Sequence, residues 1–359
     1  MKHLLVHNIR PGMKIGKDVY GSNNLLLIPK DTIVTNVIIT NLLSHDVISV
    51  YFDDTKTPIE DELINVEPFS EETLIKNTKT FKIFEQRHKK AVTEVENEFR
   101  KILDGKTPVD TEQLIVQITK LFPSDMSNIR LFDMLHSMRN YDDSTFTHCI
   151  NVGLICNVFG RWLSIPPDEL KVLTLCGLLH DIGKLKVPEE IIKKPGKLSN
   201  TEYEVVKQHS YYGYQILSKM NLDPRIAQAA LLHHERCDGY GYPMGFDRSK
   251  IIDFALIVAI ADVYDAMTSA RVYREPLCPF EVIKQLESES MQKYDPRYFL
   301  TFNEKILTTY LNTDVKLSNG KIAKVVYINR NDLTHPIVKI GSECIDLSVK
   351  KDIDIIGMA

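Results

Sequence analysis

Two pairs of adjacent side chains have types that bind metals. His180 and Asp181 directly follow the apolar run LTLCGLL in the stretch LTLCGLLHDIGK. His233 and His234 are the first two residues of the stretch HHERCDGYGYP. A carboxylate at the end of an apolar helix is costly to remove from water unless a cation or several hydrogen bonds compensate it. A histidine beside that carboxylate suggests that the compensating cation is a metal ion.

A further carboxylate raises the same cost. Asp262 lies in the apolar stretch IVAIADVYDAMTSA. Consecutive residues of a helix diverge by about 100°, so an adjacent His-Asp or His-His pair cannot chelate one ion as an i, i+4 pair does. Adjacent ligands can instead reach two neighbouring ions, with a carboxylate bridging them. We therefore expect one binuclear site, in which the twin histidines reach separate ions.

Composition limits the class of protein. The chain has 359 residues, 43% of them hydrophobic, and a formal net charge of −4. This charge gives no general attraction to nucleic acid polymers or anionic lipid, so local cations or metals must hold a polyanionic ligand. The six cysteines form no CxxC pair, and the apolar run at 254–261 is far below the roughly 20 residues of a membrane span. We expect a cytoplasmic protein with reduced thiols and no membrane insertion.

Helix signals surround the candidate ligands. Ser199 and Glu202 fit a capping box, and the Asp-Pro pairs at 223–224 and 295–296 fit the first residues of helices. Gly183 fits a C-terminal helix stop after the His-Asp pair. These signals predict that helices position the metal-binding residues.

The pattern divides the chain into four parts and predicts a mainly α protein. We expect a small N-terminal α+β module, a helical linker, a helical catalytic domain and a small β-rich C-terminal module, at 1–55, 56–125, 126–312 and 313–359. Asn319 and Gly320 fit a tight hairpin turn in the last part. The helix expected at about 70–103 has two interpretations, a dimer contact and a solvated spacer.

Four stretches together resemble the HD-GYP family of metal-dependent cyclic di-GMP phosphodiesterases, within the HD phosphohydrolase superfamily. They are HDIGK (180–184), HSYYGYQIL (209–217), HHERCDGYGYP (233–243) and ADVYDAMTSARVYR (261–274). A fifth stretch, DDSTFTHCINV (142–152), resembles the entry helix of the family. A lone HD dipeptide is weak evidence, but the five stretches in this order are highly specific.

The resemblance implies an HD-type helical bundle with a defined set of ligands. The metal ligands would be His148, His180, Asp181, His209, His233, His234 and Asp262, with Asp181 bridging the ions. Lys184 matches the lysine that neutralises the scissile phosphate in this family, a role that suits a compact ammonium. Asp181 and Lys184 would therefore be the catalytic residues.

The resemblance also implies a set of substrate-binding residues. Gly241, Tyr242 and Pro243 are the GYP segment, expected to line the guanine or phosphate side of the pocket. Arg271 and Arg274 resemble the cationic pair that holds the second phosphate. Asp265 would orient either a ligand or the attacking water.

One departure from the family bears on the number of metals. Some members carry a glutamate four residues before the first metal histidine, where it helps to bind a third ion, but this chain has Ser144. A hydroxyl is a poor ligand beside a carboxylate, so we favour two ions over three, with Asp142 or Asp143 as an alternative carboxylate source. Imidazole and carboxylate suit several transition metals, and the resemblance implies iron or manganese.

The function that the resemblance implies belongs to bacterial second-messenger signalling. Two ions would activate a water that attacks cyclic di-GMP in line at phosphorus, which gives pGpG and, after a second cut, GMP. Two alternatives stay open: a non-catalytic receptor or scaffold, and an HD phosphohydrolase that acts on another nucleotide such as 3′,3′-cGAMP. The expected protein partners are a second copy of the chain and GGDEF-type or other signalling proteins.

Overall fold

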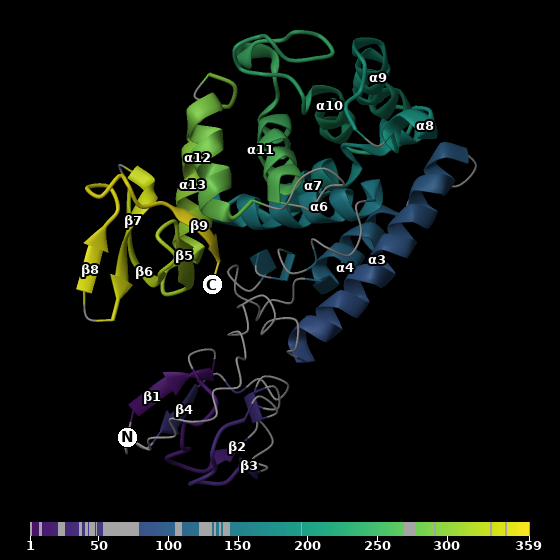
Figure 1. The fold of residues 1–359 in the computed structure, drawn as a ribbon. Coiled ribbons are helices and arrows are strands. Elements are labelled where there is room, and N and C mark those ends of the chain that lie inside the picture. The colour runs from purple at the N-terminus through teal and green to yellow at the C-terminus, as the bar shows by residue number, and fades with distance from the viewer. Residues whose placement is uncertain are drawn as a thin grey trace. The chain divides into compact units, whose positions relative to one another are not determined.

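The computed structural model describes most of the chain. The described residues are 2–6, 9–20, 26–35, 38–39, 42, 47, 49–52, 79–104, 110–121, 131–132, 134–135, 138, 144–194, 196–268, 277–290, 292–330, 332–341 and 343–358. They fall into two compact units, residues 1–86 with 358–359, and residues 87–357. Figure 1 shows the helices and strands with the labels used below.

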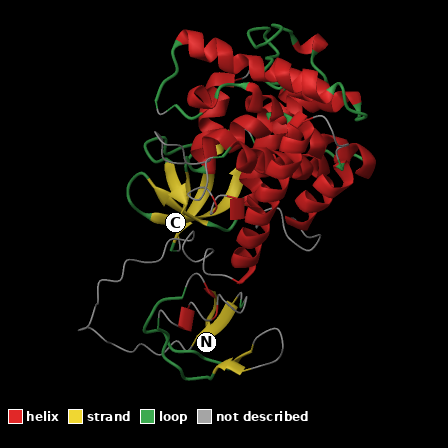
Figure 2. Ribbon diagram, turned by 90° about the vertical axis from the view of Figure 1, so that its right-hand side faces the viewer, coloured by secondary structure: helices red, strands yellow, loops and turns green. Residues whose placement is uncertain are grey.

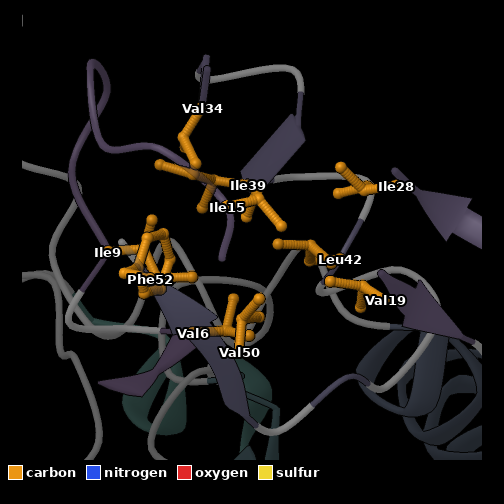
Figure 3. Close-up of a cluster of buried hydrophobic side chains, with 10 residues drawn as sticks. All are labelled: Val6, Ile9, Ile15, Val19, Ile28, Val34, Ile39, Leu42, Val50 and Phe52. Carbon is orange, nitrogen blue, oxygen red and sulfur yellow. The ribbon is translucent and has the colours of Figure 1, made fainter. Parts of the chain in front are cut away.

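The N-terminal unit has two small antiparallel sheets. Strand β1 (Lys2–Leu5) pairs with β4 (Ser49–Phe52), and β2 (Val19–Tyr20) pairs with β3 (Leu26–Ile28). Their buried faces enclose the apolar core shown in Figure 3, which consists of Val6, Ile9, Ile15, Val19, Ile28, Val34, Ile39, Leu42, Val50 and Phe52. Helical residues at 38–39 and 42 contribute to this core, so the unit has the predicted α+β character.

The second unit is mainly helical. Its helices are α4 (Thr111–Leu121), α6 (Thr145–Trp162), α7 (Pro167–Leu179), η2 (Ile182–Lys186), α8 (Glu189–Ile192), α9 (Asn200–Leu217), α10 (Pro224–Leu232), η3 (Arg248–Lys250), α11 (Asp253–Thr268), α12 (Pro279–Ser290) and α13 (Pro296–Thr309), and most of α3 (Lys79–Asp104) also belongs to it. Helix α6 is buried along most of its length and packs on α7 and α11. Helix α10 packs on α7, α9 and α11, so the ends of α7 and α10 lie among α6, α9 and α11.

The predicted helix starts are confirmed. Ser199 and Glu202 form both hydrogen bonds of a capping box at the start of α9. Asp223 caps α10 and Asp295 caps α13, each by accepting a backbone N–H two residues later, with a proline in the first turn. Because local side chains satisfy the free amides of a helix start, these three boundaries could be predicted from sequence.

The prediction for Gly183 is wrong. Gly183 lies inside η2 and its backbone is not left-handed, so it does not form the expected helix stop. A Cβ at this position would lie 1.9 Å from the carbonyl oxygen of His209 and 2.5 Å from the nitrogen of Gly213. The glycine is required because η2 approaches the backbone of α9 closely.

The C-terminal residues form a five-stranded sheet in the order β8-β7-β6-β5-β9. Its strands are β5 (Asp314–Leu317), β6 (Ile322–Asn329), β7 (Asp332–Ile340), β8 (Glu343–Asp346) and β9 (Ile355–Met358). Gly320 has a φ of 80° in the predicted hairpin turn between β5 and β6. Strand β7 packs on α12 and α13, and Figure 2 shows this sheet beside the helices.

The predicted fold class is therefore confirmed: a helical domain with a small α+β module before it and a small β module after it. The four predicted domain boundaries stay predictions. Within the described residues, each helix is too short or too polar to cross a membrane.

Candidate metal centre

Seven histidine and aspartate side chains converge where five helical segments meet. Each offers one donor atom to one of two groups, whose atoms lie within 4.8 Å of one another: Asp181, His209, His233 and His234 in the first, and His148, His180 and Asp262 in the second. They come from α6, the residues after α7, α9, the residues after α10, and α11. All seven residues predicted as ligands are thus brought together.

Asp181 lies between the two groups. Its Oδ1 is 3.2 Å from Nε2 of His209 and 3.8 Å from Nε2 of His233. Its Oδ2 is 3.3 Å from Nε2 of His180 and 3.6 Å from Nε2 of His148. Each carboxylate oxygen therefore faces a different pair of imidazoles, which is the arrangement that a bridging ligand needs.

Backbone carbonyls orient three of the imidazoles. Nδ1 of His180, His209 and His233 donates to the carbonyl oxygen three residues earlier, at 2.7, 2.7 and 3.0 Å. Because a carbonyl oxygen only accepts, Nδ1 carries the hydrogen and Nε2 presents a lone pair. Each of these three lone pairs points into the cluster, as a metal ligand requires.

The donors fit a metal ion better than they fit one another. Nε2 of His180 and Oδ1 of Asp181 are buried and have no hydrogen-bond partner among the described residues. A lone pair on Nε2 of His209 also faces Oδ1 of Asp181 at 3.2 Å, so two acceptors meet without a hydrogen between them. Acceptors that face one another in a buried space repel unless a cation lies between them.

The protonation states also suit metal ligands, which must be neutral imidazoles or ionised carboxylates. Burial and the neighbouring imidazoles hold the pKa of His233 well below its usual value, and burial lowers the pKa of His234 to about 3. Burial raises the pKa of Asp181, but the ammonium group of Lys184 outweighs it and holds that pKa well below its usual range.

Two carboxylates set the field around His148. Asp262 Oδ1 lies 3.0 Å from its Nε2, and Asp265 Oδ2 lies 2.7 Å from its Nδ1. Burial lowers the pKa of His148, but these two carboxylates raise it to about 10. The position therefore favours positive charge strongly, as either a proton or a metal ion. Asp265 was predicted to bind the substrate, or to orient a metal ligand or the attacking water. In the structure it contacts His148, one of the predicted metal ligands.

The twin histidines lie together in one donor group, although Nδ1 of His234 also lies 3.9 Å from Oδ2 of Asp262 in the other group, so their assignment to separate ions stays a prediction. Helix α10 ends at Leu232, His233 is its cap residue, and His234 lies in the turn that follows. The divergence of about 100° holds only within a helix, and here the two rings converge, with centroids 4.0 Å apart. Both imidazoles belong to the group that includes His209.

A comparison with protein families identifies the domain. Residues 125–298 match the HD domain family, and this range contains the seven donors as well as the GYP segment. Residues 125–298 are therefore an HD domain.

Several curated proteins are similar to part of this chain. The chain is 30% identical to a cyclic di-GMP phosphodiesterase of Pseudomonas aeruginosa over 233 residues. These aligned residues make up 65% of this chain and 56% of that protein. The chain is 36% identical over 187 residues to a cyclic di-GMP phosphodiesterase of Thermotoga maritima, 50% of each chain. It is 39% identical over 156 residues to 3′3′-cGAMP-specific phosphodiesterase 1 of Vibrio cholerae, 43% of this chain and 36% of that protein. The chain thus spans about half the length, or less, of these relatives.

A solved structure supports the fold. The protein Bd1817 of Bdellovibrio bacteriovorus, described as an HDG"Y"P protein, matches with a TM-score of 0.52 and 17% identity, over 85% of this chain and 99% of that chain. At this level of identity the likeness shows the fold alone.

The HD domain has a cavity beside the ligands. It measures about 240 Å³, and its wall includes His148, Lys184, Lys194, Ser144 and Thr145. Nζ of Lys184 lies 2.5 Å from Oδ2 of Asp181. A ligand in this cavity would therefore contact both an ammonium group and one edge of the metal centre.

Ser144 has a structural role in the HD domain. It is the N-cap of α6, and its Oγ accepts a hydrogen bond from the backbone N–H of Thr147 at 3.2 Å. It lies one helical turn before His148 and lines the same cavity. Asp142 and Asp143, the alternative carboxylates, lie outside the described residues.

The GYP segment covers one imidazole. The ring of Tyr242 stacks on His234, with centroids 4.6 Å apart and planes at 29°. A Cβ at Gly241 would lie 2.5 Å from Cα of Glu235, so only glycine fits where the loop folds back on the twin histidines. The peptide bond between Tyr242 and Pro243 is cis.

Glu235 holds this loop in place, and the sequence prediction missed it. Its buried carboxylate accepts backbone N–H bonds from Met244, Gly245 and Phe246 at 2.6, 3.1 and 2.9 Å. The signal in the sequence was a carboxylate directly after two candidate ligands and before a glycine-rich loop. Arg271 and Arg274, predicted to hold a phosphate, lie outside the described residues.

Proposed function

We propose that this chain is a metal-dependent phosphodiesterase that hydrolyses cyclic di-GMP to pGpG and, after a second cut, to GMP. The observation that carries the proposal is the pair of donor groups that share Asp181. Relatives that are similar to part of this chain are named as phosphodiesterases of cyclic di-GMP and of 3′3′-cGAMP. The dinucleotide 3′,3′-cGAMP is therefore the alternative substrate.

We propose two ions, of iron or manganese, as the cofactors. One would be held by His148, His180 and Asp262, the other by His209 and His233, with Asp181 between them and His234 beside both groups. Such a pair supplies positive charge to the scissile phosphate and lowers the pKa of a water molecule. The use of Ser144 as a helix cap supports two ions over three.

Lys184 is proposed to hold the charge of the scissile phosphate. Burial lowers its pKa, but the carboxylates of Asp181 and Asp262 outweigh burial and raise it above the usual value. The ammonium therefore stays charged at the wall of the cavity. A fixed cation in a partly dry cavity interacts with a phosphate far more strongly than one in open water.

The remaining substrate-binding residues stay proposals. The GYP residues, Gly241, Tyr242 and Pro243, shield His234, and we assign them to the guanine side of the substrate because their loop borders the metal centre. Arg271 and Arg274 are assigned to the second phosphate, as a cationic pair suits it. The alanine variants of both arginines should raise KM more than they lower kcat.

The decisive experiment measures metal content and product together. Full-length protein is purified without oxygen under reducing conditions, and elemental analysis counts the metals. Turnover of cyclic di-GMP, 3′,3′-cGAMP and pGpG is then compared at matched concentrations by chromatography. We expect two iron or manganese ions per chain and fastest turnover of cyclic di-GMP.

Three outcomes contradict this proposal. A protein that holds both ions, binds cyclic di-GMP and leaves it intact would be a receptor. A double variant, His180→Ala with Asp181→Ala, should lose both metals and turnover, and its retention of full turnover would exclude the metal centre as the active site. Faster hydrolysis of 3′,3′-cGAMP would select the alternative substrate.

The compartment and protein partners are proposals as well. All six cysteines are free thiols, which fits the reducing cytoplasm. The homodimer and the GGDEF-type or other signalling partners stay predictions.

A further inference from the structure

Buried polar side chains form a line from the metal centre to helix α3. Oδ2 of Asp265 accepts a hydrogen bond from Nδ1 of His148 at 2.7 Å, and Oδ1 of Asp265 accepts one from the amide of Asn151 at 3.0 Å. The amide oxygen of Asn151 lies 3.0 Å from Nε2 of His88. All four residues belong to the second compact unit, and His88, Asn151 and Asp265 are only 1%, 6% and 4% exposed.

The chemistry of Asn151 fixes the direction of these bonds. Since its amide nitrogen donates to the carboxylate of Asp265, its oxygen must accept, so Nε2 of His88 carries the hydrogen. Oδ1 of Asp265 thus accepts from Asn151, and Oδ2 accepts from His148. A carboxylate on the far nitrogen of a ligating imidazole fixes the ring and raises its basicity.

His148 thus differs from three other ligands. His180, His209 and His233 are oriented by carbonyls of their own chain segments three residues earlier. The ring of His148 in α6 is instead oriented by the carboxylate of Asp265 in α11. That carboxylate is held by the amide of Asn151 in α6, and the amide is held by His88 in α3. The orientation of this ligand depends on how three helices are placed.

Further contacts hold α3 against the helical domain. The rings of Phe99 in α3 and Phe146 in α6 meet edge to face, with centroids 5.8 Å apart. Nη1 of Arg87, beside His88, donates to the carbonyl oxygen of Lys120 in α4 at 3.3 Å. His88 is therefore presented to Asn151 by a helix that packs on both neighbours.

We propose that His88 and Asn151 are positioning residues of the metal centre. Through Asp265 they fix the ring of His148, so the metal affinity of its donor group depends on the placement of α3. The inference rests on the proposed metal centre and adds to it a structural connection to the long helix that precedes the HD domain.

The test compares two asparagines of the same helix in the full-length protein. Asn157→Leu removes a buried amide of α6 that donates to Thr174 at 2.9 Å, far along the helix from the ligands, and serves as the control. Asn151→Leu removes the amide that holds Asp265. Titration with Mn²⁺ and Co²⁺ gives the affinities, the Co²⁺ absorption spectrum reports the ligand geometry, and circular dichroism reports folding.

We expect Asn151→Leu to weaken the binding of one of the two ions by about 10–100-fold and to change the Co²⁺ spectrum. Asn157→Leu should lose stability but keep the affinity and spectrum of the wild type. A second pair tests the other residue: His88→Leu should weaken the same ion, and His88→Gln, whose amide can donate as Nε2 does, should restore it.

The outcomes separate this inference from the proposed function. If folded Asn151→Leu and His88→Leu proteins keep wild-type affinity and spectrum for both ions, the inference is wrong. If Asn151→Leu does not fold, the two His88 variants decide. If the wild type binds fewer than two ions, the proposed metal centre is wrong instead.

Discussion

At the scale of single residues, Asp181 explains how several imidazoles share a buried space. Its two oxygens face different pairs of histidines, and the carboxylate stays ionised because the ammonium group of Lys184 offsets the cost of burial. A sequence reveals such ligands because only a few residue types bind metals, and those types are costly to bury without one. The residue types alone predicted His180, Asp181, His233, His234 and Asp262 as ligands, and the family resemblance added His148 and His209.

The residues that orient the ligands could not be predicted in this way. Glu235, Asn151 and His88 are polar residues of common types, and their roles depend on partners that the fold brings to them. Gly183 illustrates the same limit, because a glycine that ends a helix and a glycine that permits close backbone approach look alike in sequence. The fold distinguishes them.

Gly183 gives the first prediction. In Gly183→Ala the new methyl group would overlap the carbonyl oxygen of His209, a backbone atom that cannot move without displacing α9 and its ligand. We expect the free energy of unfolding to fall by about 3 kcal/mol or more, with weaker Mn²⁺ binding. Urea unfolding and metal titration measure the two effects.

A glycine of α6 supplies the control. In Gly153→Ala the Cβ would lie 3.4 Å from Leu178, an ordinary contact, and alanine is favoured over glycine within a helix by roughly 0.5–1 kcal/mol. This variant should match or exceed the wild type in stability. Equal effects of the two substitutions would contradict the close-approach role of Gly183.

At the scale of elements, local signals predicted where helices begin and tertiary contacts decided the rest. Capping pairs at Ser199, Asp223 and Asp295 lie within one turn of the amides that they satisfy, so the sequence contains both partners. The rings of His233 and His234 converge because α10 ends at Leu232, with His233 as its C-cap.

Asp295 gives the second prediction. It caps α13 and forms ion pairs with Arg248 and Arg297 while almost fully buried. Asp295→Asn keeps an acceptor for the cap but loses the charge, so the free energy of unfolding at pH 7 should fall by about 1.5–3 kcal/mol, the usual contribution of a hydrogen bond to a charged group. Urea unfolding measures the loss.

The pH dependence of this loss has a defined sign. Burial raises the pKa of Asp295, but Arg297 and Arg248 outweigh it and lower the pKa from 3.8 to about 2. The carboxylate therefore stabilises the fold above about pH 4, and its contribution disappears as the pH falls through about 2. The difference in the free energy of unfolding between wild type and Asp295→Asn should therefore become smaller as the pH falls over that range.

An exposed carboxylate supplies the control. Asp168→Asn, which changes a carboxylate near Lys171, should lower the free energy of unfolding by less than about 1 kcal/mol at any pH.

At the scale of the whole molecule, the chain combines two units with different sources of stability. The N-terminal unit has an apolar core of ten described residues (Figure 3). In the helical unit, five segments each supply at least one candidate metal donor.

The sequence pattern predicted the order of the α+β, helical and β-rich parts of the chain, because periodicity and turn residues are local features. It did not predict the division at residue 86 or the packing of β7 on α12 and α13, because both depend on contacts between distant segments.

The third prediction concerns metal removal. An ion that binds only the folded chain stabilises it by about 4 kcal/mol when present at about 1,000 times its Kd, and here the ions would join the ends of α7 and α10 to α6, α9 and α11. A chelator should therefore lower the thermal transition temperature of the helical unit in the full-length protein and leave that of the N-terminal unit unchanged.

Two variants assign the transitions seen in calorimetry. Leu42→Ala opens a cavity in the N-terminal core and should lower the free energy of unfolding of that unit by about 2–5 kcal/mol, so the transition that it shifts belongs to the N-terminal unit. The double variant His180→Ala with Asp181→Ala should show no response to the chelator, because the shared ligand is gone. Equal shifts of both transitions, or a response that survives in the double variant, would mean that the bound metal acts elsewhere than at Asp181.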